Sequence, residues 1–135
     1  MKQGNAICAI VLIGIIGVGI IGLMLDSAPP APVVINENAT FSGFIDVVGD
    51  NRFHSIRVNE NVTRIHIVLT CPGVDFDLYG RFGKLPSTNY YDFKGYQLGG
   101  EDVYYDYPDP GIWHLMVHSY SGVGHYDLIL EFGYE

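Results

Sequence analysis

Alternating apolar and polar residues near the C-terminal end of the chain predict two half-buried strands. Trp113, Leu115 and Val117 occupy every second position of the first strand, and the second has an apolar residue at Tyr126, Leu128, Leu130 and Phe132. The intervening segment 119–124, SYSGVG, contains small residues that tolerate a chain reversal, so the two strands are predicted to pair as a hairpin. Since a lone hairpin is marginally stable in water, upstream strands must cover its apolar face.

From about residue 41 up to this pair of strands, the sequence predicts further short strands and no helix. Turn-forming GDN, NEN and PG sequences separate four candidate strands, at residues 41–48, 53–58, 63–71 and 74–82. Segment 83–100 lacks alternation and is predicted to be a long surface loop, and residues 103–107 return as a strand. With about seven strands in all, the pattern favours an all-β fold: one β-sandwich of the jelly-roll or immunoglobulin-like kind.

Two of these strands show which face is expected to be buried. In strand 63–71, Ile65, Ile67 and Leu69 share one face. In strand 74–82, Phe76 and Leu78 share a face, while the aspartates on either side of Phe76 point the other way. Both strands therefore offer a single apolar face to the predicted core.

The N-terminal part of the chain differs in character. Residues 6–25, AICAIVLIGIIGVGIIGLML, contain neither charge nor proline, and as a helix they are long enough to cross a bilayer. We interpret them as a retained transmembrane anchor behind a short N-terminal stretch, residues 1–5. Lys2 and the amino terminus precede the helix and Asp26 follows it, so the positive-inside tendency places the N-terminus in the cytoplasm. The expected location is the cell membrane, with a single pass and an extracytoplasmic C-terminal domain.

Two alternatives to a retained anchor remain open. A cleaved signal peptide would need a cut near Ala28, where Asp26 and Pro29 make a poor cleavage site. A leader that ends in Lys2-Gln3-Gly4 before a hydrophobic helix resembles prepilins, although Ala9 stands where those proteins have glutamate. In that case the chain would be a pilin-like subunit, and its helix would form the core of an extracellular filament.

A proline-rich spacer, residues 26–39, separates the anchor from the predicted domain at residues 40–135. Its APPAP sequence cannot continue a helix and favours an extended conformation. Two N-glycosylation sequons begin at Asn38 and Asn61, in turn-like polar surroundings from which a glycan could project. Glycosylation of both is expected only in a host that attaches such glycans.

Charge and cysteine content exclude some functions. The chain carries 7 Lys plus Arg and 15 Asp plus Glu, a formal net charge of −8. This acidity argues against binding to nucleic acid or to anionic lipid surfaces. Cys8 lies in the predicted anchor and Cys71 on an inner strand position, so they are not expected to pair and the domain must fold without an internal disulfide.

Several short motifs between about residues 40 and 132 occur in a characteristic order: GDNRFHSIRVN, VDFDLYG, PGIWHLMV, SYSG and GHYDLIL. They include a DxDLY-like strand, a PGxW-like strand entry and a closing aromatic-x-Leu strand. In these features the chain resembles the bacterial pre-peptidase C-terminal domain family. The resemblance implies a small, non-catalytic β-sandwich of a kind usually appended to secreted enzymes.

Acidic residues suggest a calcium site. Asp75 and Asp77 share a strand face, and carboxylates from segment 101–109 could converge on them; the candidate ligands are Asp75, Asp77, Glu101 and Asp102. The resemblance also implies calcium, since some members of that family bind it near the sandwich edge. The alternative is that these aspartates cap turns and accept backbone hydrogen bonds. Calcium is thus an optional ligand, and no cofactor is required.

The histidines suggest a second metal site. In one register of the predicted hairpin, His118 lies beside His125, and these imidazoles with Asp127 could hold a transition metal. The alternative is a solvated pair of exposed histidines. Neither interpretation provides a hydrolytic triad, because Ser119 and Ser121 lie in a turn without the elbow that would direct a nucleophile.

Tyrosines crowd the segment before the final strands, and strand alternation could not bury them all. The candidate binding surface consists of Tyr90, Tyr91, Tyr96, Tyr104 and Tyr105. Alternatively, these rings only cover the flank of a loop-rich sandwich. The sequence therefore predicts a membrane-anchored extracytoplasmic module that binds or assembles at the cell surface and does not catalyse. Its expected partners are the membrane, through residues 6–25, and a surface protein or polysaccharide, with self-association as a further option.

Overall fold

The computed structural model describes residues 33–34 and 38–135. The predicted anchor, residues 6–25, lies outside these residues, as does most of the proline-rich spacer. Among the described residues, no helix has the length and apolar character that crossing a bilayer requires. The described part of the chain therefore corresponds to the predicted domain and a few residues of the spacer.

The described chain forms strands arranged in two sheets. The first sheet has the order β1-β3-β8-β5-β6, and its strands are β1 (Val33–Val34), β3 (Asn51–Val58), β8 (Gly111–Ser121), β5 (Asp75–Phe82) and β6 (Phe93–Gly95). The second sheet has the order β2-β9-β4-β7, with strands β2 (Ala39–Ile45), β9 (Gly124–Tyr134), β4 (Val62–Thr70) and β7 (Glu101–Asp106). Neighbouring strands pair antiparallel, except the two-residue β1 and β3, which are parallel.

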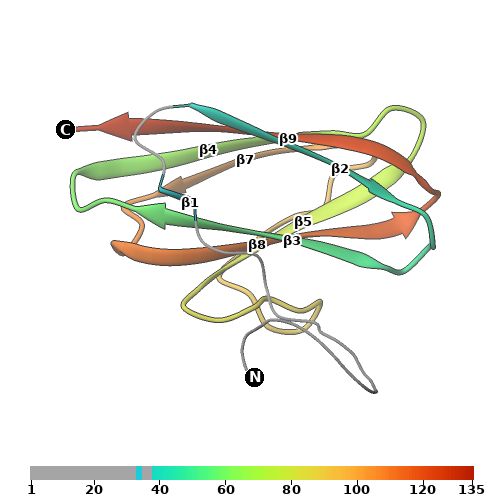
Figure 1. Cartoon of the computed structure of the whole chain (residues 1–135), viewed down its shortest axis with the longest axis horizontal. Helices are drawn as coiled ribbons and strands as arrows, with labels where there is room; N and C mark the ends of the chain where they lie inside the picture. The colour runs from blue at the N-terminus through green and yellow to red at the C-terminus, as the bar shows by residue number, and fades with distance from the viewer. Residues whose placement is uncertain (1–32, 35–37) are drawn as a thin grey trace, which may run out of the picture.

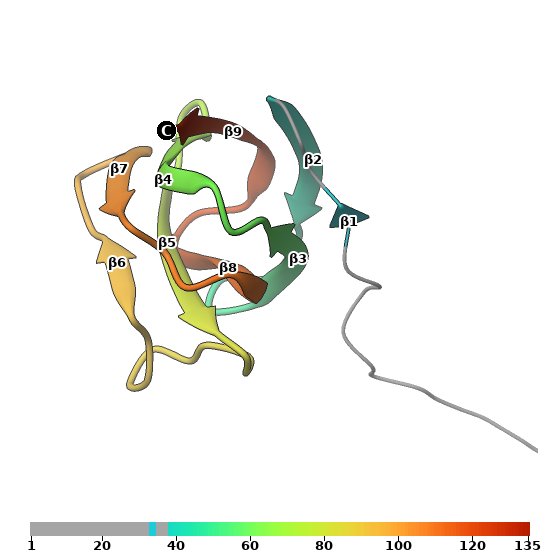
Figure 2. The same cartoon turned by 90° about the vertical axis from the view of Figure 1, so that its left-hand side faces the viewer.

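The two sheets pack face to face as a β-sandwich, which confirms the predicted all-β class (Figure 1). From β2 onward, every connection except that from β5 to β6 takes the chain from one sheet to the other. In a view turned by 90° about the vertical axis, β1, β2 and β3 lie at one side of the sandwich and β6 and β7 at the other (Figure 2). Residues far apart in sequence, such as those of β5 and β7, are thereby brought close together.

The core lies between the sheets and consists of the residues that alternation predicts. Trp113, Leu115 and Val117 of β8 are buried, as are the alternate residues of β9 at Tyr126, Leu128 and Leu130. Phe132 is only partly buried and packs against the edge of this cluster. The predicted inner residues of β4 and β5 are also buried in it: Ile65, Ile67, Leu69, Phe76 and Leu78. The two-residue periodicity thus identified the core face of these four strands correctly, although Tyr79 and Met116 on the opposite faces are buried too.

The predicted hairpin of the last two strands is wrong. β8 pairs with β3 and β5, and β9 pairs with β2 and β4, so both strands are central in their own sheets and both edges of each are already paired. Gly122, with φ of 87°, helps the chain to turn from one layer to the other. The Ser119 hydroxyl donates a hydrogen bond to the Gly122 carbonyl at 2.6 Å and fixes this corner.

The predicted surface loop 83–100 also needs correction. Its residues Phe93–Gly95 form β6, which pairs with β5 at the edge of the first sheet. Phe93 packs over Gly80 of β5, where an added Cβ would overlap the phenylalanine ring. The described part of the sandwich therefore has eight strands of at least three residues, besides β1, in place of the predicted seven or so.

Candidate functional site

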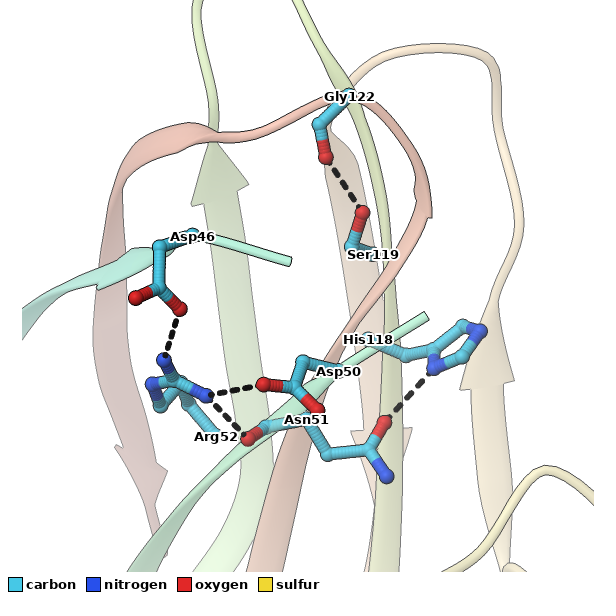
Figure 3. Close-up of polar contacts among 7 residues, drawn as sticks. All are labelled: Asp46, Asp50, Asn51, Arg52, His118, Ser119 and Gly122. Atoms are coloured by element: carbon cyan, nitrogen blue, oxygen red, sulfur yellow. Dashed lines mark hydrogen bonds and ion pairs between the residues drawn. The ribbon is translucent and has the colours of Figure 1, made fainter. Parts of the chain in front are cut away.

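A row of polar side chains crosses the outer face of the first sheet near the end of β8. His118 of β8 lies opposite Asn51 of β3 on one side and Asp77 of β5 on the other. The Asn51 side-chain oxygen and His118 Nδ1 are 2.7 Å apart, and Figure 3 shows the imidazole turned toward the amide. These residues alternate with the buried core residues Val117 and Leu78, so their side chains point away from the core.

Figure 3 shows polar contacts in two turns beside this row, around Arg52 and at Ser119. The Arg52 guanidinium forms ion pairs with two carboxylates, 3.3 Å from Asp46 Oδ1 and 3.6 Å from Asp50 Oδ2. These ion pairs hold the turn between β2 and β3. Ser119 exchanges backbone hydrogen bonds of 3.0 Å with the same turn, donating to the Asp50 carbonyl and accepting from the Gly49 amide. The turn between β2 and β3 therefore holds the end of β8 in place.

Next to this end of β8 lies a pocket of about 300 Å³. Its lining residues come from β5, β6, the following turn and the end of β8: Asp75, Asp77, Lys94, Tyr96, Leu98 and Tyr120. Three of them are largely exposed, Tyr96 by 74%, Leu98 by 92% and Tyr120 by 69%. The pocket thus combines two carboxylates and one ammonium group with solvent-exposed rings and an aliphatic side chain.

Lys94 supplies the positive charge of this pocket. Its Nζ lies 5.0 Å from the centre of the Tyr79 ring and 5.2 Å from that of Tyr96, within the range of cation–π attraction. A hydrogen bond with Tyr79 raises the pKa of Lys94, and the nearby Asp77 charge acts in the same direction. The ammonium group is therefore charged and already has aromatic and acidic neighbours.

Behind the pocket, Asp77 meets a second carboxyl group, that of Glu101 on β7. Glu101 is only 3% exposed, and its Oε1 accepts a hydrogen bond from the Gln97 amide at 2.8 Å. Within the described part of the chain, no other group hydrogen-bonds to its Oε2. Burial first, then the neighbouring charges of Asp77 and Asp75, raise the pKa of Glu101 to about 7, and burial also raises the pKa of Asp77. Both raised pKa values favour a neutral, protonated carboxyl group at this buried position, because a second ionised carboxylate beside Asp75 and Asp77 would be repelled.

Acidic side chains also hold the turn after β6, which forms one wall of the pocket. Besides the Glu101 bond to Gln97, Asp75 Oδ1 accepts a hydrogen bond from the Gly99 amide at 3.0 Å. The Gly99 carbonyl in turn accepts from the Phe76 amide at 3.2 Å. The turn that carries Tyr96 and Leu98 is therefore fixed to β5 and β7 by acidic side chains and a backbone bond.

The predicted calcium ligands fall into two places. Asp75, Asp77 and Glu101 gather beside the pocket, but Asp102 lies on the outer face of the second sheet, where its carboxylate is 2.6 Å from His66 Nε2. Within residues 33–34 and 38–135, no three or more His, Cys, Asp or Glu side chains are placed to hold a metal ion. Asp75 has the alternative role that the sequence allowed, as acceptor of a backbone amide.

On that second outer face, His66 lies between Asp102 and Glu131, the latter 3.0 Å from its Nδ1. The Tyr104 ring stacks on the imidazole, with the two ring centroids 4.1 Å apart. Partial burial lowers the pKa of His66, but hydrogen bonds to Glu131 and Asp102 outweigh this effect and the net pKa is raised. Both ring nitrogens can donate only in the imidazolium form, which this arrangement favours.

The residues of the second predicted metal site lie in different surroundings. His118 belongs to the first sheet, whereas His125 and Asp127 belong to β9 in the second, so the register that would have paired the histidines does not occur. The His125 ring packs edge to face against the Phe44 ring, with the two centroids 4.6 Å apart. Asp127 accepts a hydrogen bond from the Ser42 hydroxyl. The hairpin geometry on which this prediction depended is therefore wrong.

The tyrosines predicted to form one binding surface separate into three groups. Tyr90, Tyr91 and Tyr96 are exposed near β5 and β6, by 67%, 45% and 74%. Tyr104 faces the opposite outer surface, over His66. Tyr105 is partly buried against the core, with its ring centroid 5.1 Å from that of Trp113, and so lies apart from the exposed tyrosines. Tyr120, which no sequence pattern singled out, lines the same pocket as Tyr96.

Both sequons lie at exposed positions. Asn38 immediately precedes β2, and Asn61 lies in the turn between β3 and β4, where its backbone carbonyl accepts a hydrogen bond from the Glu135 amide. The Asn61 side chain remains available at the surface, so its glycosylation stays a prediction.

One hydroxyl and imidazole pair has the composition of part of a catalytic site. Ser55 Oγ lies 2.7 Å from His114 Nδ1 on the outer face of the first sheet. Ser55 is only 2% exposed, and among the described residues no carboxylate orients His114. A substrate could not reach this hydroxyl, so the pair does not provide an activated nucleophile.

No protein-family model and no curated protein sequence matches this chain. Among solved structures, it is similar to the pre-peptidase C-terminal domain of collagenase from Bacillus anthracis, with a TM-score of 0.59, 20% identity, and coverage of 78% of this chain and 100% of that one. It is also similar to PliG from Aeromonas hydrophila, a periplasmic inhibitor of g-type lysozyme, with a TM-score of 0.55, 10% identity, and coverage of 76% and 96%.

A third similar structure is CorA, a surface-associated copper-binding protein important in copper acquisition by Methylomicrobium album BG8, with a TM-score of 0.50 and 10% identity. That match covers 76% of this chain and 98% of CorA. At these identities the likeness concerns the fold alone. In fold, the chain resembles a pre-peptidase C-terminal domain, as its sequence motifs predict.

Proposed function

We propose that this protein is a membrane-anchored, non-catalytic β-sandwich module that binds a ligand at the cell surface through the pocket between Tyr96 and Tyr120. The observation that carries the proposal is that exposed rings and charged groups meet in one concave site. Exposed aromatic side chains of this kind are typical of recognition surfaces. The expected partner is a surface protein or a polysaccharide.

The extracytoplasmic location is supported by two independent observations. The uncharged segment 6–25 and its flanking charges favour an anchor with the domain outside. Two structurally similar proteins are described as periplasmic and as surface-associated. A non-catalytic role is supported by the likeness to a pre-peptidase C-terminal domain and by the inaccessibility of the Ser55 and His114 pair.

Protease treatment of intact cells tests the anchored topology. We expect an added protease to digest the region after Asp26 without membrane permeabilisation, because the domain lies outside. An immunoblot with an antibody against the C-terminal strand would follow the digestion, and a cytoplasmic protein would serve as the internal control. Protection of the domain until the membrane is permeabilised would contradict the orientation.

Binding to cells tests the pocket. The full-length chain, purified in detergent, is expected to bind to intact cells of its source, and the variant Tyr96→Ala/Tyr120→Ala is expected to bind about tenfold more weakly, because buried aromatic contacts dominate many interfaces. Tyr107→Ala is the matched control, since Tyr107 is 77% exposed but precedes β8, far from its pocket end. Equal binding by all three proteins would reject this surface as the binding site.

A further inference from the structure

We infer, on the basis of the proposed function, that the pocket beside β5 and β8 takes a neutral, hydroxyl-rich ligand: a sugar unit of an uncharged polysaccharide. The inference rests on the kinds of groups that line the pocket and on the charges already present there. Those charges disfavour both cationic and anionic ligands, whereas the exposed rings and the hydrogen-bonding groups suit a sugar.

The exposed side chains of the pocket suit the apolar face of a sugar ring. Tyr96 and Tyr120 come from different elements, the turn after β6 and the end of β8, and both line the same hollow. Leu98 adds an exposed aliphatic side chain. A tyrosine ring offers a large contact area at a small cost in conformational entropy, so these rings can cover the C–H groups of a pyranose.

The polar side chains of the pocket supply both acceptors and a donor. Asp75 uses Oδ1 to accept from the Gly99 amide, and a carboxylate has lone pairs for further donors. Asp77 is the second acceptor and Lys94 is the donor. A sugar hydroxyl donates one hydrogen bond and accepts others, so a ring with several hydroxyls can pair with all three groups at once.

A cationic ligand suits the pocket poorly. The Lys94 ammonium covers one face of the Tyr96 ring, and it also lies near Tyr79 and the Asp77 carboxylate. A lysine or arginine side chain of a protein partner would meet this like charge and would have to displace it. Lys94 therefore offsets part of the attraction that the two carboxylates would offer to a cation.

An anionic ligand is disfavoured by the acidic groups of the site. Asp75 and Asp77 line the pocket and Glu101 lies directly behind it, against the positive charge of Lys94. The whole chain has a formal net charge of −8. Sulfated, phosphorylated or uronate-rich polymers would thus be repelled at the site and at a distance.

The size of the pocket limits how much of a polymer it can hold. A volume of about 300 Å³ lies at the lower end of the range of roughly 300–1,000 Å³ that is usual for small-molecule sites. One or two sugar units fill such a space, and the chain of a polysaccharide can leave it because Tyr96, Leu98 and Tyr120 border open solvent.

Affinity electrophoresis of the full-length chain tests the inference. The chain would be solubilised in a polyoxyethylene detergent, because detergents with sugar head groups would compete for the pocket. Native gels would contain one of three neutral polymers (hydroxyethylcellulose, mannan or dextran) or heparin as the anionic probe, and binding to poly-lysine would be followed separately. We expect retardation by at least one neutral polymer, none by heparin, and no loss of retardation when salt is added, because the ligand is uncharged.

Substitutions connect the retardation with the pocket. Tyr96→Ala and Tyr120→Ala should each weaken binding about tenfold, whereas Tyr107→Ala should leave it unchanged, and circular dichroism would establish that all variants are folded. Failure of every neutral polymer to retard the chain, or retardation that the two pocket variants retain, would overturn the inference. Binding to poly-lysine that Tyr120→Ala abolishes would also overturn it, and would leave the proposed function standing with a basic protein as the partner.

Discussion

Replacing Trp113 by alanine is expected to lower the free energy of unfolding by about 3 to 5 kcal/mol. The side chain is 1% exposed and is surrounded by rings of both sheets, with centroids 5.5 Å away at Phe82, 6.1 Å at Phe93 and 5.1 Å at Tyr105. Its indole N–H also donates to the Asp109 carbonyl at 2.8 Å. Removal of the indole leaves a cavity that rigid strands cannot close and a carbonyl without its donor.

Such a loss is large compared with the stability of about 5 to 15 kcal/mol that is usual for small domains. Thermal unfolding of the full-length chain in detergent, followed by far-ultraviolet circular dichroism, should show the melting temperature lowered by roughly 15 to 30 °C. Trp113→Phe should have a smaller effect because it retains most ring contacts, and Val47→Ala, at a position 55% exposed, should have almost none. A melting temperature for Trp113→Ala close to that of the wild type would contradict this account of the core.

The faces of the strands could be predicted from the sequence, but their partners could not. Alternation reports which side chains share a face, and Ile65, Ile67 and Leu69 are buried as their spacing predicts. The segment after Val117 contains the small residues that a hairpin needs, yet a corner between two sheets needs the same residues. Only the pairing of β8 with β3 and β5, which fills both of its edges, decides between these outcomes.

The candidate site was predicted in part for a similar reason. Asp75, Asp77 and Tyr96 were selected by residue type and lie at one pocket, but Tyr120 and Lys94 reach it through tertiary contacts between elements. Lys94 lies on a strand of three residues, which is too short to show alternation. Tyr105, by contrast, is drawn into the core beside Trp113, as its two-residue spacing from Val103 could have indicated.

Glu101 was recognised as an acidic residue, but its burial was not. It stands two positions before Val103, so alternation already places it on the inner face of β7. A charged residue at an inner position is unusual and is expected to have a partner or a shifted pKa. The identity of that partner, Asp77 on the other sheet, could not be inferred because no sequence pattern reports contacts between sheets.

The buried pair of carboxyl groups leads to the second large expected effect, on the pH dependence of stability. Burial raises the pKa of Glu101 from its ordinary value of 4.5 to about 7, so ionisation is less favourable in the folded than in the unfolded chain. Below about pH 4.5 both states hold the proton and stability is unaffected. As the pH rises to about 7 the unfolded state releases its proton first, so stability falls by up to roughly 3 kcal/mol and then becomes constant.

The variant Glu101→Gln separates this effect from other titrations. A glutamine keeps the Oε1 acceptor for the Gln97 amide, and like the protonated acid it carries no charge. Because it cannot ionise, the variant should lack the fall in stability between about pH 5 and about pH 8. It should equal the wild type at low pH and exceed it at high pH.

Thermal unfolding of the full-length chain across this pH range, with wild type and variants in the same detergent, provides the measurement. Glu60→Gln makes the same chemical change at an exposed residue of the turn between β3 and β4, so its curve should follow that of the wild type. His66, whose pKa is raised, also loses its stabilising contribution as the pH rises, but it does so equally in all three proteins and cancels in the comparison. If Glu101→Gln melts at or below the temperature of the wild type at about pH 8, Glu101 is stabilised as an anion, which contradicts the raised pKa of this buried carboxyl group.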